Sequence, residues 1–136
     1  MTIIADASLV AKLLFNESET AEAEAVVRRG DPLIAPELIV AELASVAWKK
    51  RRRREVSAED SVAAVALAAR MLERLEPVVP LRQRAMEMAN ELEHSPYDCF
   101  YLALAEREQG KLATFDRRLS DRVSASRYAS LLLTAD

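Results

Sequence analysis

The sequence predicts an α/β fold, in which a short parallel sheet of about five strands is sandwiched between helices. Short apolar runs alternate along the chain with longer segments whose apolar residues recur at helical spacing. This alternation is typical of a parallel sheet covered by helices on both faces. Acidic residues also follow several of the predicted strands, at the edge where open parallel sheets bind ligands.

The first predicted strand contains the β-branched residues Ile3 and Ile4. Its apolar run is too short for a helix and suits a strand buried on both faces. Asp6 follows, and a helical apolar pattern begins at once and predicts a helix over residues 7–15. We therefore expect Asp6 at the carboxyl end of a buried strand and at the amino end of a helix.

The segment that follows predicts a second helix and a second strand. Asn16 and Glu19 resemble a capping box at the start of the helix, and Gly30 is a plausible end. Residues 33–35 form a short apolar run that predicts a buried strand. Pro36 suits the first position of the next helix.

The helix after Pro36 carries an apolar stripe formed by Ile39, Leu43, Val46 and Ala47. Glu42 borders this stripe and does not belong to the polar face. It is either a glutamate at the edge of the core or a carboxylate that points into a cleft. The helix ends in six consecutive basic residues: Lys49, Lys50, Arg51, Arg52, Arg53 and Arg54.

Three elements are predicted in the middle of the chain. Ser57 and Asp60 resemble a capping box, and an alanine-rich helix extends over residues 58–75. It is apolar almost all round, as in a central helix or one that pairs with another subunit. Two prolines bracket a very short strand within residues 77–80, and a helix follows over residues 82–92.

The last third of the chain carries two more acidic residues. Ser95 can cap a helix whose first turn contains Asp98, and Gly110 ends that helix. Residues 111–114 predict a strand, Asp116 precedes a short helix, and residues 131–133 are a candidate for a final strand. Both have a purely structural alternative: Asp98 could be a first-turn acid that the helix dipole favours, and Asp116 could be only an N-cap.

Composition narrows the class of protein. The 136 residues fit one domain over residues 1–136, and 51% of them are apolar, which excludes a disordered chain. No apolar run reaches the length of a membrane span, and no signal peptide opens the chain. Cys99 is the only cysteine, which excludes an internal disulfide and fits a reducing cytoplasm. With only two glycines, a glycine-rich phosphate loop is absent.

The acidic residues are expected to converge. Right-handed crossovers place successive strand ends at one edge of the sheet, where Asp6, Glu42, Asp98 and Asp116 would meet. Four adjacent carboxylates repel one another and need a multivalent cation. Oxygen ligands select Mg²⁺ or Mn²⁺ over zinc. We interpret His94, the only histidine, as a surface turn residue and Cys99 as a small packed apolar residue.

Four segments carry a family resemblance: Ile4-Ala5-Asp6-Ala7-Ser8, Ala41-Glu42-Leu43-Ala44, Tyr97 to Ala105, and Thr114 to Leu119. In order and spacing they resemble PIN-domain nucleases, and above all the VapC-type toxins of bacterial toxin–antitoxin pairs. The resemblance implies a Mg²⁺- or Mn²⁺-dependent endoribonuclease, a dimer and an antitoxin partner. It implies metal-binding and catalytic roles for Asp6, Glu42, Asp98 and Asp116, with Ser8 and Thr114 as supporting polar residues. The chain departs from the family at Ser45, where asparagine is common, and at Phe115, where a small or polar residue is common.

Two alternatives and one uncertain segment stay open. The fold could serve only to bind RNA or a partner, without catalysis. A phosphoacceptor signalling domain has a similar order of elements, but it requires an adjacent acidic pair where this chain has Asp6 alone. Lys49 to Arg54 are either a solvated helix end that complements the helix dipole or a strip that contacts RNA phosphates.

Overall fold

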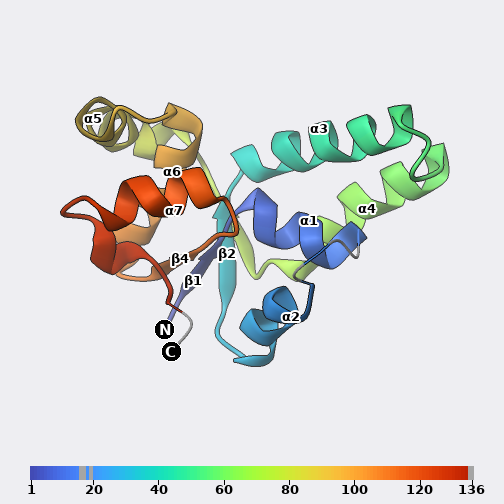
Figure 1. Ribbon diagram of the computed structural model, residues 1–136, viewed down its shortest axis with the longest axis horizontal. Coiled ribbons are helices and arrows are strands. Elements are labelled where there is room, and N and C mark those ends of the chain that lie inside the picture. Colours follow the sequence, from blue (N-terminus) through green and yellow to red (C-terminus); the bar gives the residue numbers. More distant parts are fainter. Residues whose placement is uncertain (16–17, 19, 135–136) are drawn as a thin grey trace.

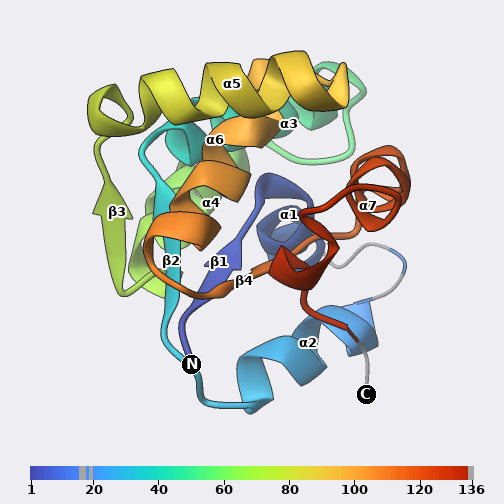
Figure 2. The ribbon, with the colours of Figure 1, turned by 90° about the vertical axis from the view of Figure 1, so that its left-hand side faces the viewer.

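The computed structural model describes residues 1–15, 18 and 20–134. Its centre is a four-stranded parallel sheet made of β1 (Ile3–Ala5), β2 (Leu33–Pro36), β3 (Arg74–Glu76) and β4 (Lys111–Ala113). The strands lie in the order β3-β2-β1-β4 (Figure 2). The first strand of the chain is therefore central and has a neighbour on each side. β1 and β2 are entirely buried, as their continuous apolar runs predict.

Seven described helices cover this sheet. They are α1 (Ala7–Phe15), α2 (Thr20–Arg28), α3 (Leu38–Arg52), α4 (Ala58–Met71), α5 (Arg82–Leu92), α6 (Pro96–Arg107) and α7 (Arg117–Ser124). Figure 1 shows α5 and α6 on one side of the sheet and α1, α3 and α4 on the other. The predicted α/β class with a parallel sheet between helices is confirmed. None of the described helices combines the length and the apolar character that a membrane crossing requires.

Several local predictions are confirmed. α1 and α5 have the predicted bounds. Ser57 caps α4 by accepting a hydrogen bond from the Asp60 backbone N–H at 3.0 Å. Gly30 follows α2 with a φ of +79°, a conformation that glycine adopts without strain. The capping box proposed for Asn16 and Glu19 lies outside the described residues.

The boundary between α4 and β3 differs from the prediction of one helix over residues 58–75. The helix ends at Met71, and Leu72 is already extended. The Glu73 backbone N–H then donates to the Leu33 carbonyl at 2.7 Å, and Leu75 pairs with Ala35 in the sheet. Pairing with the free edge of β2 outweighs the helix propensity of this segment.

The structure also differs from the prediction at Pro36 and over residues 77–80. Pro36 is the last residue of β2 and pairs with Glu76, so α3 begins two residues later, at Leu38. The stretch over residues 77–80 is no strand, because a 3₁₀ turn occupies Val79–Leu81 with Pro80 in its first turn. Proline has no N–H to donate to a sheet, which favours the turn.

The final predicted strand, at residues 131–133, is reduced to a single parallel bridge. Ala129–Leu131 form a 3₁₀ turn, and Leu132 then pairs with Leu112. One backbone hydrogen bond, from the Leu133 N–H to the Leu112 carbonyl at 2.8 Å, holds the segment beside β4. The described sheet therefore has four strands where about five were expected.

Candidate active site

Asp6 lies where the sequence predicts, between the end of β1 and the start of α1. It is the only buried charged residue among those described, with 6% of its surface exposed. One carboxylate oxygen, Oδ1, accepts hydrogen bonds from the Ser8 hydroxyl at 2.6 Å and from the Leu9 backbone N–H at 3.1 Å. These bonds fix the carboxylate in place.

Burial raises the pKa of Asp6 to about 6, because the ionised form has lost its contact with water. The hydrogen bonds from Ser8 and Leu9 act in the opposite direction, and the nearby charge of Asp98 raises the pKa further. A bound cation would remove this penalty, since it favours the ionised carboxylate.

Ser8 and Thr114 connect the ends of β1 and β4. The Ser8 hydroxyl donates to Asp6 and accepts from the Phe115 backbone N–H at 2.8 Å. Thr114 Oγ1 lies 3.4 Å from Ser8 Oγ and accepts from the Asp116 backbone N–H at 3.0 Å. The two hydroxyls therefore hold the backbone that carries Asp116 beside the strand that carries Asp6. Phe115 contributes its backbone to this link, so its aromatic side chain does not disturb it.

Glu42 lies on α3 and is half-buried, at the border of the apolar stripe. The Tyr101 hydroxyl, which comes from α6 on the other side of the sheet, donates to Glu42 Oε1 at 2.6 Å. Burial raises the pKa of Glu42, the hydrogen bond from Tyr101 lowers it, and the charges of Asp98 and Asp6 raise it. Of the two interpretations of Glu42, this geometry supports a carboxylate held in the acidic cluster.

Asp98 lies in the first turn of α6, which Ser95 caps by accepting from the Tyr97 N–H at 3.3 Å. His94 Nε2 lies 2.6 Å from Asp98 Oδ2, and only 10% of the histidine side chain is exposed. His94 thus lies in the turn between α5 and α6, as interpreted, but its side chain is largely buried against Asp98 and is not at the surface. The spacing of four residues between His94 and Asp98 was the signal that could have revealed this contact.

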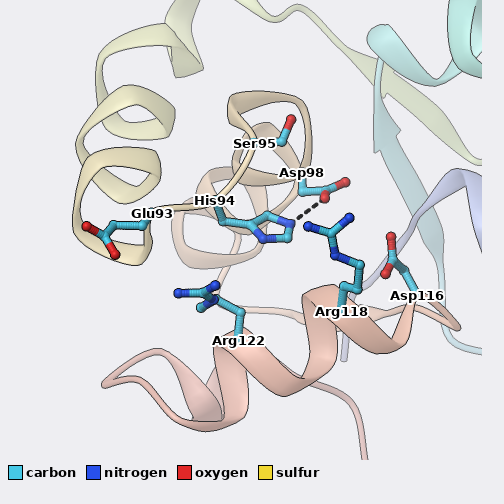
Figure 3. Close-up of a pocket in the computed structure, with 7 residues that line it drawn as sticks. All are labelled: Glu93, His94, Ser95, Asp98, Asp116, Arg118 and Arg122. Atoms are coloured by element: carbon cyan, nitrogen blue, oxygen red, sulfur yellow. Dashed lines mark hydrogen bonds and ion pairs between the residues drawn. The ribbon is translucent and has the colours of Figure 1, made fainter.

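Asp116 is the N-cap of α7, and its Oδ1 accepts from the Leu119 N–H at 3.2 Å. Asp98 and Asp116 line one side of a cleft of about 200 Å³ that is also bounded by Glu93, His94, Ser95, Arg118 and Arg122 (Figure 3). Arg118 and Arg122 were not predicted from the sequence. They follow the acidic motif at helical spacing, which places both on the side of α7 that faces the cleft.

The four carboxylates thus gather at the carboxyl edge of the sheet in two overlapping sets. The charge of Asp98 raises the pKa of both Asp6 and Glu42, and the charge of Asp6 raises that of Glu42, while Asp98 and Asp116 share the cleft. Within the described part of the chain, no three acidic, histidine or cysteine side chains are arranged to hold one metal ion together. Mg²⁺ is commonly held by one or two carboxylates and several waters, so this donor set fits magnesium better than zinc.

The basic segment over residues 49–54 does not reach the cleft. It forms the last turn of α3 and the residues just after it, at the end that points away from α5, α6 and α7 (Figure 1). Lys50 pairs with Glu55 at 3.6 Å, and the Arg52 guanidinium lies 5.0 Å from the centre of the Trp48 ring. Cys99, by contrast, is fully buried, and burial raises its thiol pKa to about 11, as expected for a packed apolar residue.

Comparison with known proteins identifies similar chains. The family model described as PIN domain matches residues 3–124. Ribonuclease VapC3 of Pyrobaculum aerophilum is 30% identical over 134 residues, which are 92% of this chain and 97% of the relative.

Solved structures show the same fold. Mycobacterium tuberculosis VapC20, described as a sarcin-ricin loop cleaving toxin, superimposes with a TM-score of 0.69 at 22% identity and covers 88% of this chain and 93% of its own. VapBC-1 from nontypeable Haemophilus influenzae superimposes with a TM-score of 0.66 at 20% identity and covers 91% of this chain and 93% of its own.

Proposed function

Because this chain belongs to the PIN-domain family, we propose that it is a metal-dependent endoribonuclease and the toxin of a VapC-type toxin–antitoxin pair. The observation that carries the proposal is the convergence of Asp6, Glu42 and Asp98 beside the cleft that Asp116 lines. Membership of this family removes the phosphoacceptor signalling domain as an alternative.

We assign Asp6, Glu42, Asp98 and Asp116 as the residues that would hold Mg²⁺ or Mn²⁺. A divalent ion at these oxygens supplies positive charge to the scissile phosphate and lowers the pKa of a coordinated water. The chain itself supplies the orientation. Ser8, Tyr101 and His94 each hold one carboxylate at 2.6 Å, so the acidic side chains keep fixed positions while the substrate binds.

An antitoxin and a second copy of the chain are the partners we propose. The side of the molecule formed by α3 and α4 exposes several large apolar residues: Val40, Trp48, Val62 and Leu67. Such surfaces commonly accept an amphipathic helix. We propose the cytoplasm as the compartment, since the RNA substrates are present there.

RNA cleavage by the purified protein tests this function. We expect cleavage of single-stranded RNA with Mg²⁺ or Mn²⁺, no cleavage in a chelator, and recovery when either metal is restored. Asp98→Asn should abolish cleavage while circular dichroism shows an unchanged fold. Activity that persists in chelator would refute the metal assignment, and wild-type activity in a folded D98N variant would refute the site. RNA binding without cleavage in all metals would favour the non-catalytic alternative.

A further inference from the structure

Two arginines of α7 line the candidate active site. Arg118 and Arg122 are four residues apart, so they project from one face of the helix into the cleft beside Asp98 and Asp116. Figure 3 shows the Arg118 side chain extending between Asp98 and Asp116, with Arg122 one turn further along the helix. A cleft assigned to metal binding thus has two cationic side chains beside its carboxylates.

Neither guanidinium forms an ion pair with a carboxylate of the described residues. Arg74, Arg84 and Arg127 each form ion pairs shorter than 3 Å with glutamates. In contrast, no described carboxylate lies within ion-pair distance of Arg118 or Arg122. Both side chains are exposed, so no packing role explains their place in the cleft. Their hydrogen-bond donors are available to a ligand.

The nearest carboxylates already have other partners. His94 Nε2 contacts Asp98 Oδ2, and the Leu119 N–H donates to Asp116 Oδ1. If the arginines served to neutralise these acids, ion pairs would be expected here, as they form elsewhere on the surface. Two unpaired guanidiniums converging on one cleft instead form a site for an anion. Guanidinium groups are charged at all physiological pH values and match the oxygens of a phosphate in a bidentate way.

We propose that Arg118 and Arg122 bind a backbone phosphate of the RNA next to the phosphate that is cleaved. This inference rests on the proposed ribonuclease function and adds the subsite that positions the strand. The carboxylates, with their metal, take the scissile phosphate, and the arginines hold the neighbouring one. Contact with phosphate carries no base preference, so this subsite sets the register and affinity of the strand but not the sequence that is cut.

Binding of RNA to a cleavage-deficient protein tests the subsite. In an Asp6→Asn background with Mg²⁺, a fluorescein-labelled single-stranded RNA is titrated by anisotropy at several KCl concentrations. Arg118→Ala and Arg122→Ala should each weaken binding by about tenfold, the loss expected for a charge-assisted hydrogen bond. Because both arginines are proposed to bind one phosphate, changing both to alanine should reduce the slope of log affinity against log salt by about 0.7, the value for one phosphate contact on a single strand, and each single change should reduce it by less.

Arg117→Ala is the matched control, because Arg117 is exposed on the same helix with the same charge but lies outside the cleft. It should leave affinity and slope unchanged. Arg118→Lys should restore the salt slope and only part of the affinity, since lysine keeps the charge but loses the bidentate geometry. Thermal unfolding should be the same for all variants, because neither cleft arginine contributes an ion pair to the fold.

Two results would overturn the subsite. If the alanine variants bind RNA as the parent does, the arginines do not contact phosphate. If RNA affinity is retained while Mn²⁺ binding, followed by electron paramagnetic resonance, becomes tighter, the arginines are counter-ions of the carboxylates. RNA cleavage by the wild-type chain distinguishes failure of the subsite from failure of the proposed ribonuclease function. If the wild-type chain does not cleave RNA, both proposals are refuted. If it cleaves RNA but the alanine variants bind RNA as tightly as the parent, only the subsite is refuted.

Discussion

Asp6 is a carboxylate whose ionisation the fold opposes. Its pKa in the folded protein is about 6, against an ordinary value of 3.8. Because the folded value is higher, folding favours the protonated form, and ionisation of Asp6 lowers stability as pH rises from about 4 to about 6. The difference corresponds to about 3 kcal/mol at neutral pH in the absence of metal.

Asp6→Asn is therefore expected to stabilise the metal-free protein. Asparagine keeps an oxygen that can accept the bonds from Ser8 and Leu9, but it carries no charge. In chelator, urea unfolding should show a gain of up to about 3 kcal/mol at pH 7.5 and no gain below pH 4. The gain should shrink when Mg²⁺ is added, because a cation stabilises the ionised aspartate and not the amide.

A D6N variant that is less stable than wild type at pH 7.5 in chelator would contradict this account. It would mean that the ionised carboxylate is compensated within the fold. The equivalent measurement on Asp121→Asn serves as a control, since Asp121 is exposed and lies outside the acidic cluster. That change should give no pH-dependent gain.

At the scale of residues, the carboxylates of the candidate site are easier to predict from the sequence than the side chains that form hydrogen bonds with them. Asp6, Glu42, Asp98 and Asp116 stand out because each follows a strand, lies in the first turn of a helix or borders an apolar stripe. Tyr101 and His94 do not, since a tyrosine within an apolar helix reads as core, and a lone histidine before a proline reads as a turn. The contact of Tyr101 with Glu42 depends on how α3 and α6 pack, which local pattern does not specify, whereas only the four-residue spacing indicates the contact of His94 with Asp98.

At the scale of elements, the strands with buried neighbours were the predictable ones. β1, β2 and β4 carry apolar runs that only burial explains. β3 reads Arg74-Leu75-Glu76 and lies at the edge of the sheet, so its polar residues resemble the end of a helix. Edge strands are defined mainly by hydrogen bonds to a neighbour, and those bonds leave little trace in the sequence.

The start of β4 offers a test of the sheet register. A Cβ added to Gly110 would collide with the backbone carbonyl of Thr2, just before Lys111 pairs with Ile3. Gly110→Ala should lower the free energy of unfolding by about 1–3 kcal/mol, as overpacking against backbone does. Denaturant unfolding measures the loss.

Gly30→Ala is the matched comparison, because nothing lies within 4 Å of a Cβ at Gly30. Its φ of +79° still strains an alanine, so a smaller loss of about 1 kcal/mol is expected. If G110A unfolds at the same denaturant concentration as wild type, residues 2 and 110 do not approach as described.

The basic end of α3 gives a second test at this scale. If residues 49–54 contact RNA phosphates, changing Arg51, Arg52 and Arg53 to alanine should lower the log–log salt slope by about 0.7 per lost contact. Because this segment lies away from the cleft, the maximal rate of cleavage should stay unchanged. An unchanged slope would mean that the segment only complements the dipole of α3.

At the scale of the whole molecule, the proposed biology predicts an effect on growth. Production of this chain alone in bacteria should halt growth, and the D6N form should not, because only the carboxylate site acts on RNA. Co-production of the small protein encoded beside it should restore growth and yield a stable complex, which size-exclusion chromatography with light scattering would detect. A wild-type chain that is harmless at high level, yet cleaves RNA in vitro, would exclude the toxin role and leave the nuclease role intact.

The central position of β1 also determines when during synthesis the protein becomes active. β1 is made before the other three strands, but its pairing with β4 and the link from Ser8 to Phe115 require residues made much later. At a synthesis rate of about 5–20 residues per second, Asp116 is added roughly 5–20 seconds after Asp6. Until residues 111–116 have been made, the nascent chain lacks a complete acidic site, so RNA cleavage through that site cannot begin before then.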